Sequence, residues 1–579
     1  MTETSQNDVN AKLEPLLRQV YGPTVAADLL ARIAGLIERW RPRMALRRPW
    51  LDQGDAMLIT YADTLQASGQ SSGQASGESP LATLHRFLVS RARDRLGAVH
   101  LLPFFPSTSD DGFSVVDYRA VDPAIGDWTD VAALGRDFEL MLDAVINHAS
   151  AESGWFLAFR RGEAPFRDWF IRAETDADYT SVIRPRALPL LTEARTVDGP
   201  VHVWTTFSAD QVDLNFAEPT LLVEILDILL DYCAKGARFI RLDAIGFLWK
   251  RLGTGCMHLP ETHALVRVMR HVVEAAAPGT LVITETNVPH AENIAYLGRG
   301  GDEAHLVYQF PLPPLVQLAF QTGDASALTS WARDLEAPPP GTTFLNFLAS
   351  HDGIGVRPLE GVVPQVAVDG MAATIVERGG AVSMRNMPDG TQRPYELNIS
   401  YIDGLVPTEA DDAMRAAAMR AAHAILLALQ GLPAIYIHSL LGSRSDRAGM
   451  ERTGRNRSIN RAKLNVAGVE AGLDDEASLR HRVFAGIGEL LLARKREPGF
   501  HPDAAQRVLA ADPGLVVIER RTADGRVLLA AVNVTPGSRR LALPEGSRWR
   551  CILDGESRGG GALELAGFEV RWLVADEGG

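Results

Sequence analysis

Two short apolar runs in this chain each end in a carboxylate, and one strand–helix–strand length separates them. Ala237–Leu242 leads to Asp243, and Leu281–Thr284 leads to Glu285. Consecutive parallel strands present the residues that follow them at the same rim of a sheet or barrel. A lone acid at such a place is typical of a helix cap or a salt bridge. Two acids at one rim are what retaining glycoside chemistry uses, one as nucleophile and one as proton donor.

The alternation of strand-like and helical segments continues along the chain. Helical periodicity is expected over Leu81–Arg95, Leu221–Ala234 and Ala413–Gln430. The other runs with the length and apolar content of strands are Met57–Tyr61, Ala98–Phe104, Glu139–Ile146, His305–Gln309, Thr343–Leu348 and Ala434–His438. Such alternation predicts an α/β fold.

The two ends of the chain differ from its middle. Helical periodicity over Leu13–Trp40, interrupted at Gly22-Pro23, predicts a helical extension within 1–55. Short alternating strands predict an antiparallel β domain over 500–579. The expected strands are Gly514–Arg520, Arg526–Asn533, Arg548–Ile552 and Phe568–Val574. Gln66–Ser79 has no apolar residue larger than alanine, which predicts a flexible loop.

Composition excludes several classes of function. A formal net charge of −14 argues against a general affinity for nucleic acid, whose backbone selects basic surfaces. Cys233, Cys256 and Cys551 form no CxxC pair and fit reduced thiols better than a disulfide framework. The N-terminus lacks the features of a signal peptide, and no apolar run reaches the roughly 18 residues of a membrane span. We therefore expect a cytoplasmic protein without a nucleic-acid or membrane partner.

Two further motifs close other apolar runs, Asp143–His148 and Phe344–Asp352. In order, these four motifs resemble the signature regions of the α-amylase superfamily, glycoside hydrolase family 13. The resemblance extends from about Leu58 to the C-terminus. It implies a (β/α)8 TIM barrel over 56–499, an inserted domain, called domain B, over 149–220, and the C-terminal β domain already expected.

Shorter motifs narrow the resemblance to the sucrose phosphorylase subfamily. They are Tyr61–Asp63, His100–Phe105, Asp110–Phe113, Val121–Gly126, Leu252–Cys256 and His351–Val356. Within it, the chain is most similar to the glucosylglycerate phosphorylases. This rests on the N-terminal extension and on Asp110–Val115, Leu248–Lys250, His258–His263 and Tyr395–Asn398. The resemblance implies a retaining phosphorylase, a monomer or homodimer, that converts a small α-glucoside and inorganic phosphate to α-glucose 1-phosphate and a free acceptor.

The resemblance also implies a role for each motif residue. Asp243 matches the nucleophile that forms a β-glucosyl ester, Glu285 the general acid/base, and Asp352 the carboxylate that stabilises the oxocarbenium-like transition state. Residues matching the glucose subsite are Asp110, Phe113, His148, Arg241, His351 and Arg457, with Asp110 and Arg457 as a pair that closes its far side. Residues matching the phosphate and acceptor site are Arg186, Tyr395, Glu396 and Phe247.

Physical arguments refine the expected catalytic pair. Arg241 lies two residues before Asp243 on the same strand, so it points the same way and can hold Asp243 ionised. Glu285 must be protonated at neutral pH to release a leaving group, so it should lie in a less solvated, more negative setting than Asp243. No cofactor is implied. Asn147 and Asp213 match calcium ligands of amylases, although phosphorylases of this type need no metal.

The acceptor stays open between several sugars. Phe247 stands where sucrose phosphorylases carry tyrosine and Glu396 where they carry glutamine, which argues against sucrose itself. The arginine-rich segment Ser443–Arg461 suits either the carboxylate of glycerate or a phosphorylated fructose. We favour 2-O-α-glucosyl-D-glycerate as substrate. Sucrose, sucrose 6-phosphate and glucosylglycerol remain alternatives, as does an α-glucosidase or transglucosidase of the same fold.

Overall fold

The computed structural model describes residues 3–67, 77–186, 188–386 and 391–575. Most of the predicted loop Gln66–Ser79 lies outside these residues, so that expectation stays a prediction. All three cysteines are buried and free of disulfides, as expected.

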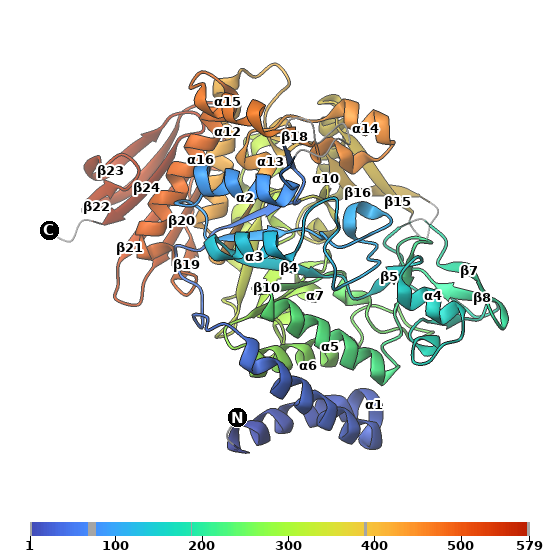
Figure 1. The fold of residues 1–579 in the computed structure, drawn as a ribbon. Coiled ribbons are helices and arrows are strands. Elements are labelled where there is room, and N and C mark those ends of the chain that lie inside the picture. Colours follow the sequence, from blue (N-terminus) through green and yellow to red (C-terminus); the bar gives the residue numbers. More distant parts are fainter. Residues whose placement is uncertain (1–2, 68–76, 187, 387–390, 576–579) are drawn as a thin grey trace.

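Parallel strands close into a barrel in the order β1-β17-β13-β12-β11-β10-β4-β3 (Figure 1). Their bounds are β1 Met57–Thr60, β3 Ala98–Leu101, β4 Glu139–Ala144, β10 Ala237–Leu242, β11 Leu281–Thr284, β12 Leu306–Tyr308, β13 Thr343–Phe347 and β17 Leu432–Tyr436. The predicted barrel is confirmed. Only β17 is displaced toward the N-terminus, because the chain enters the short helix α13, Ile437–Leu440, directly after Tyr436.

The strands are buried almost throughout, as in parallel sheets covered by helices on the outside. The covering helices include α2 Pro80–Arg91, α5 Pro219–Ala234, α6 Pro260–Ala276, α12 Asp412–Ala428 and α16 Leu479–Arg496. The adjacent strands β10 and β11 pair in register, with Leu242 opposite Thr284. Asp243 and Glu285 therefore leave the barrel side by side.

The N-terminal helix α1, Glu3–Trp40, lies along one side of the barrel against α5 and α6 (Figure 1). Gly22 has non-helical angles (φ 77°, ψ 169°), so the predicted interruption is confirmed. The Tyr21 hydroxyl donates to the Phe216 carbonyl oxygen at 2.8 Å, and the Tyr21 ring meets Trp249 edge-on. By length and composition, Asn7–Arg43 is apolar enough to cross a membrane, which differs from the expectation above. In the fold its apolar residues, such as Leu17 and Ile33, pack against the barrel helices.

Two insertions surround the carboxyl ends of the strands. Between β4 and β10 lie small antiparallel sheets, made by β5 His148–Ser150 with β9 Gln211–Asp213, and by β6 Arg172–Ala173, β8 Gly199–Trp204 and β7 Leu191–Thr196. After β13, a further sheet contains β14 Ile354–Gly355, β16 Gln392–Asn398 and β15 Ala381–Asn386. No strand was predicted in the segment that forms this sheet.

An antiparallel sheet ends the chain, in the order β19-β20-β21-β24-β22-β23. Its strands are β19 Ala505–Val508, β20 Leu515–Arg521, β21 Val527–Asn533, β22 Arg539–Cys551, β23 Ser557–Leu565 and β24 Val570–Ala575. The four expected strands are present, whereas β19, β23 and the first half of β22 were missed. The glycines at the start of β23 have the composition of a loop. Gly560 is required by close packing, since a Cβ there would lie 1.8 Å from the Pro544 carbonyl oxygen.

Candidate active site

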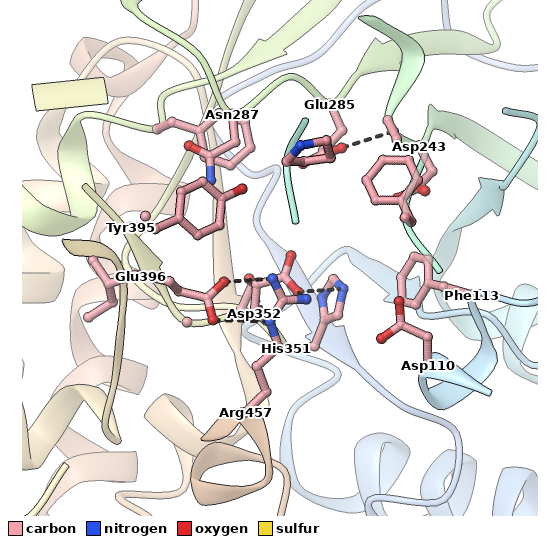
Figure 2. Close-up of a pocket in the computed structure, with 18 of the residues that line it drawn as sticks. Asp110, Phe113, Asp243, Glu285, Asn287, His351, Asp352, Tyr395, Glu396 and Arg457 are labelled. Carbon is pink, nitrogen blue, oxygen red and sulfur yellow. Dashed lines mark hydrogen bonds and ion pairs between the residues drawn. The ribbon is translucent and has the colours of Figure 1, made fainter. Parts of the chain in front are cut away.

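A pocket at the carboxyl ends of the barrel strands contains almost every residue singled out from the sequence (Figure 2). Its lining includes Asp110, Phe113, His148, Arg186, Arg241, Asp243, Glu285, His351, Asp352, Tyr395, Glu396 and Arg457. Phe247 is the exception, because it lines a second pocket that adjoins the first. The sequence motifs thus converge on one place from six barrel strands and two insertions.

Arg241 lies between the two carboxylates of the expected catalytic pair. Its Nη1 atom is 2.6 Å from Asp243 Oδ1, and its Nη2 atom is 3.9 Å from Glu285 Oε2. The Ala244 backbone N–H donates to Glu285 Oε2 at 2.9 Å. One guanidinium and one backbone amide therefore fix the acids relative to each other.

Asp143 also contacts the Arg241 guanidinium, although the sequence analysis assigned it no role. It stands opposite Arg241 in the β4–β10 ladder, and its Oδ1 atom is 2.5 Å from Arg241 Nη1. His100 Nε2 contacts the other carboxylate oxygen at 2.7 Å. Asp143 opens the motif that ends in His148, and its position at the end of a strand was the signal that could have identified it.

The protonation states of Glu285 and Asp243 agree with the expectation only in part. Burial raises the pKa of Glu285 to about 7, with Arg241 opposing the rise and the charges of Asp243 and Asp352 adding to it. Burial also raises the pKa of Asp243, and the Arg241 guanidinium opposes that rise. The prediction that Glu285 is the less solvated of the two is wrong, since its side chain is 15% exposed and that of Asp243 is 11% exposed. What distinguishes them is the closer contact of Asp243 with Arg241.

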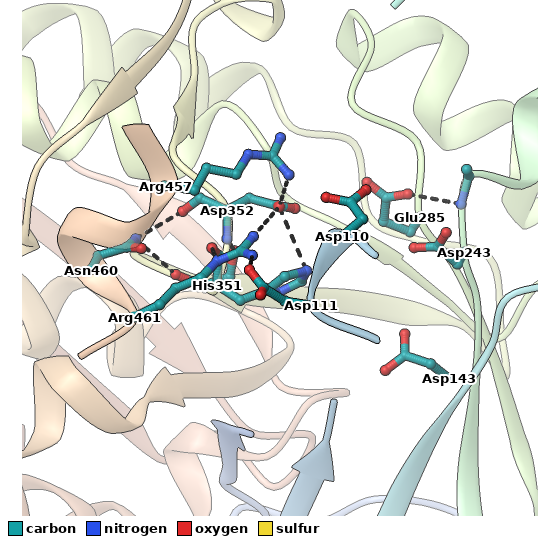
Figure 3. Close-up of polar contacts among 12 residues, drawn as sticks. Asp110, Asp111, Asp143, Asp243, Glu285, His351, Asp352, Arg457, Asn460 and Arg461 are labelled. Atoms are coloured by element: carbon teal, nitrogen blue, oxygen red, sulfur yellow. Dashed lines mark hydrogen bonds and ion pairs between the residues drawn. The ribbon is translucent and has the colours of Figure 1, made fainter. Parts of the chain in front are cut away.

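Asp352 lies in a cationic cluster at the opposite wall (Figure 3). Arg457 Nη1 contacts its carboxylate, and Arg461 Nη2 and His351 Nε2 lie 3.6 and 3.5 Å from the same oxygen. Although burial favours the neutral acid, the nearby guanidinium groups, with Arg457 first and Arg461 after it, hold the pKa of Asp352 well below its usual range. Asp352 is therefore a fixed negative charge facing the pocket.

Arg457 also binds Glu396 in bidentate fashion, through Nε at 3.1 Å and Nη2 at 2.6 Å. Glu396 therefore has a cationic partner within the pocket. The implied pair of Asp110 with Arg457 is not formed. Asp110 instead contacts Arg186 Nη2 at 2.8 Å, a partner supplied by the insertion between β4 and β10. Two carboxylates of the pocket already satisfy Arg457, which leaves Asp110 to the inserted arginine.

The floor of the pocket is aromatic and neutral. The rings of Phe113 and His351 stack with centroids 4.9 Å apart and an interplanar angle of 5°. Burial lowers the pKa of His351 to about 3, and burial also lowers that of His148. His148 Nε2 lies 2.9 Å from the Phe113 carbonyl oxygen. Gln211, which the sequence reading missed, donates to Asp110 Oδ2 at 3.2 Å and to the same carbonyl oxygen.

The residues that match amylase calcium ligands hold an ammonium group. Lys250 Nζ lies 2.5 Å from Asp213 Oδ2 and 3.0 Å from Asn147 Oδ1, and it also donates to the Phe247 carbonyl oxygen. Because the Lys250 ammonium already contacts these oxygens, the same oxygens do not fit a calcium ion. Among the described residues, no group of three or more His, Cys, Asp and Glu side chains has the arrangement of a metal site.

Replacing Lys250 with methionine is expected to lower the free energy of unfolding by about 3–5 kcal/mol, because the buried carboxyl group of Asp213 would lose its cationic partner. Lys463→Met is the matched control. Lys463 pairs with Asp63 at the surface, where such a pair contributes about 1 kcal/mol or less. Urea unfolding of the two variants gives the comparison. Equal losses of stability would contradict a structural role for the Lys250 cation.

Comparisons with known proteins agree with this geometry. Residues 95–352 match the family model of the α-amylase catalytic domain. The chain is 44% identical to a glucosylglycerate phosphorylase of Spirochaeta thermophila, over 97% of this chain and 98% of that protein. It is 42% identical to a glucosylglycerate phosphorylase of Escherichia coli, over 97% and 99% respectively. Among solved structures, sucrose 6F-phosphate phosphorylase of Thermoanaerobacter thermosaccharolyticum superposes with a TM-score of 0.72 at 23% identity, over 85% of this chain and 95% of that one.

Proposed function

The chain belongs to the glucosylglycerate phosphorylases of the α-amylase family, and from this membership we propose that it cleaves 2-O-α-D-glucosyl-D-glycerate with phosphate to α-D-glucose 1-phosphate and D-glycerate. The observation that supports this most is the identity of more than two fifths along nearly the whole length of both relatives. The contact of Arg241 with two carboxylates at the barrel rim agrees with it.

The proposed reaction is a double displacement through a covalent ester. Asp243 attacks the anomeric carbon of the glucosyl group while Glu285 protonates the departing glycerate oxygen, which breaks the glycosidic bond. Phosphate then attacks the β-glucosyl ester and releases Asp243, with Glu285 acting as base for the proton that phosphate loses. Two inversions leave the product in the α configuration.

The remaining residues are proposed to bind the glucose unit and to shape its surroundings. The fixed negative charge of Asp352 would stabilise positive charge at the anomeric centre in the transition state. The neutral imidazoles of His148 and His351 suit sugar hydroxyls, because each offers one donor and one acceptor. Phe113 supplies a flat apolar face beneath them.

The acceptor preference tests the proposal directly. We expect synthesis from glucose 1-phosphate to be at least about 100-fold more efficient in kcat/KM with D-glycerate than with fructose, fructose 6-phosphate or glycerol. Fructose and glycerol lack the charged group for which the site is built, and fructose 6-phosphate carries its charge on a larger skeleton, further from the reacting hydroxyl. The measurement is phosphate release with each acceptor. A preference for one of the other three would assign the chain to a sister specificity.

Phosphorolysis is separated from hydrolysis by a second assay. With glucosylglycerate as substrate, we expect glucose 1-phosphate to form only when phosphate is added, with little free glucose. Release of glucose at the same rate without phosphate would instead identify a hydrolase on the same scaffold.

We also propose how the chain divides into domains. We place a helical extension at 1–55, the catalytic barrel at 56–499 with domain B at 149–220, and a β domain at 500–579. We also propose a cytoplasmic monomer or homodimer without a nucleic-acid or membrane partner. The net charge of −14 argues against nucleic acid, and the free thiols fit a reducing compartment.

A further inference from the structure

A second pocket adjoins the first on the side of Glu285. The two share Arg186, Glu285, Asn287 and Tyr395, so their spaces are continuous across the proposed acid/base. The group released from the anomeric carbon receives its proton from Glu285, and the second pocket is therefore where that group would lie. Its apolar wall comes from Phe207, Phe247 and Met257.

The polar part of this second pocket is strongly basic. Its lining contains Arg184, Arg186, Arg357 and Arg385, and Glu285 is the one acid among its described lining residues. Because the pKa of Glu285 is raised to about 7, that acid is largely neutral at lower pH. The lining therefore has an excess of positive charge that an anionic ligand would compensate.

Three of these arginines differ from the fourth in their surroundings. Arg186 contacts Asp110 at 2.8 Å, Arg385 contacts Glu360, and Arg184 is exposed to solvent. Arg357 is partly buried and has no ion pair among the described residues; its Nε atom, like that of Arg385, is buried without a hydrogen-bond partner there. A buried guanidinium nitrogen without a partner is unfavourable, and a carboxylate ligand would satisfy it.

Neighbouring strands fix the segment that presents Arg357. The Val356 backbone N–H donates to the Tyr395 carbonyl oxygen at 3.1 Å. Gly355 lies so close to Asn287 that a Cβ at that position would be 2.5 Å from Asn287 Nδ2. Figure 2 shows Asn287 beside Tyr395, on the Glu285 side of the pocket. Asn287 Oδ1 is also buried without a hydrogen-bond partner among the described residues.

We propose that Arg357 and Asn287 determine the acceptor specificity, with Arg357 binding the carboxylate of glycerate and Asn287 Oδ1 accepting a hydrogen bond from one of its hydroxyls. This inference rests on the proposed function. It differs from the sequence-based expectation, which placed the carboxylate partner at Arg186 or in Ser443–Arg461. In that segment, Arg457 is engaged by Asp352 and Glu396, and Arg461 contacts Asp111.

The test compares Arg357→Met with Arg452→Met, a matched loss of an exposed arginine outside both pockets. Each variant is assayed for synthesis from glucose 1-phosphate with D-glycerate and with glycerol, which has the same carbon skeleton without the carboxylate. We expect Arg357→Met to lower kcat/KM for D-glycerate on the order of 100-fold, the effect of losing a charge-assisted hydrogen bond. The kcat/KM for glycerol should stay within a few-fold of the value of the parent. Arg357→Lys should recover part of the loss, because it keeps the charge without the planar fork.

Exchange of labelled phosphate into glucose 1-phosphate gives a reference that needs no acceptor and reports whether each variant is folded. The inference is supported if the loss with D-glycerate exceeds the loss of exchange at least tenfold. Equal losses with glycerate, glycerol and exchange would overturn it, because Arg357 would then act on folding or on phosphate in general. If the parent enzyme does not use D-glycerate, the proposed function fails; if the parent uses it and Arg357→Met does so equally well, only this inference fails.

Discussion

Replacing Asp243 with asparagine is expected to abolish turnover, with kcat reduced by roughly 10⁵-fold or more, as when other enzymes lose their nucleophile. An amide of the same size cannot form the glycosyl ester. The pocket should keep its shape, because Arg241 retains its contact with Asp143 at 2.5 Å. The measurement is glucose 1-phosphate formation from glucosylglycerate.

Asp369→Asn, an exposed change on α10, Gln365–Glu377, is the control and should have the activity of the parent. Thermal unfolding of both variants then separates loss of chemistry from loss of fold. Residual activity of Asp243→Asn within tenfold of the parent would contradict the nucleophile assignment.

Replacing Glu285 with glutamine is expected to slow phosphorolysis of the natural glycoside by about 10³- to 10⁴-fold, the upper range for loss of a general acid. Glucosyl fluoride should be affected much less, because fluoride leaves without a proton. For each substrate, the rate of glucosyl-enzyme formation is measured in the parent and in the variant at one pH. Equal losses for good and poor leaving groups would show that Glu285 is not the proton donor.

The pH profile of the parent gives a second signature of the same residue. The acid form of Glu285 predominates below its pKa of about 7, so kcat/KM for the glycoside should decline as pH rises through that value. Glu285→Gln cannot ionise and should lack this decline. An alkaline limb that persists unchanged in the variant would assign it to another group.

The sequence was sufficient for the barrel and for the carboxylates, because both depend on local patterns. An apolar run that ends in an acid marks a strand and the rim where it finishes, as with Asp243 and Glu285. The antiparallel edge strand β23 was missed because it begins with several glycines, which have the composition of a loop, although Gly560 is there to allow close approach to Pro544.

Partners between distant segments were beyond the sequence for a different reason. Asp110 pairs with Arg186 and not with Arg457. This pairing depends on which carboxylates lie within contact distance of Arg457 in the folded chain. The ammonium of Lys250 likewise contacts Asp213 only because the fold brings the segment after β10 next to the end of β9. Arg357 was overlooked because the arginine-rich segment elsewhere gave the stronger compositional signal.

The forked contact of Arg457 limits how this enzyme could change its acceptor in evolution. One guanidinium binds both Glu396, which we propose to lie on the acceptor side, and Asp352, which we propose to stabilise the anomeric centre. A change of Glu396 to the glutamine of sucrose phosphorylases would therefore alter the electrostatics of Asp352 as well. Substitutions at the two subsites are expected to show epistasis, so that specificity changes only when several positions change together.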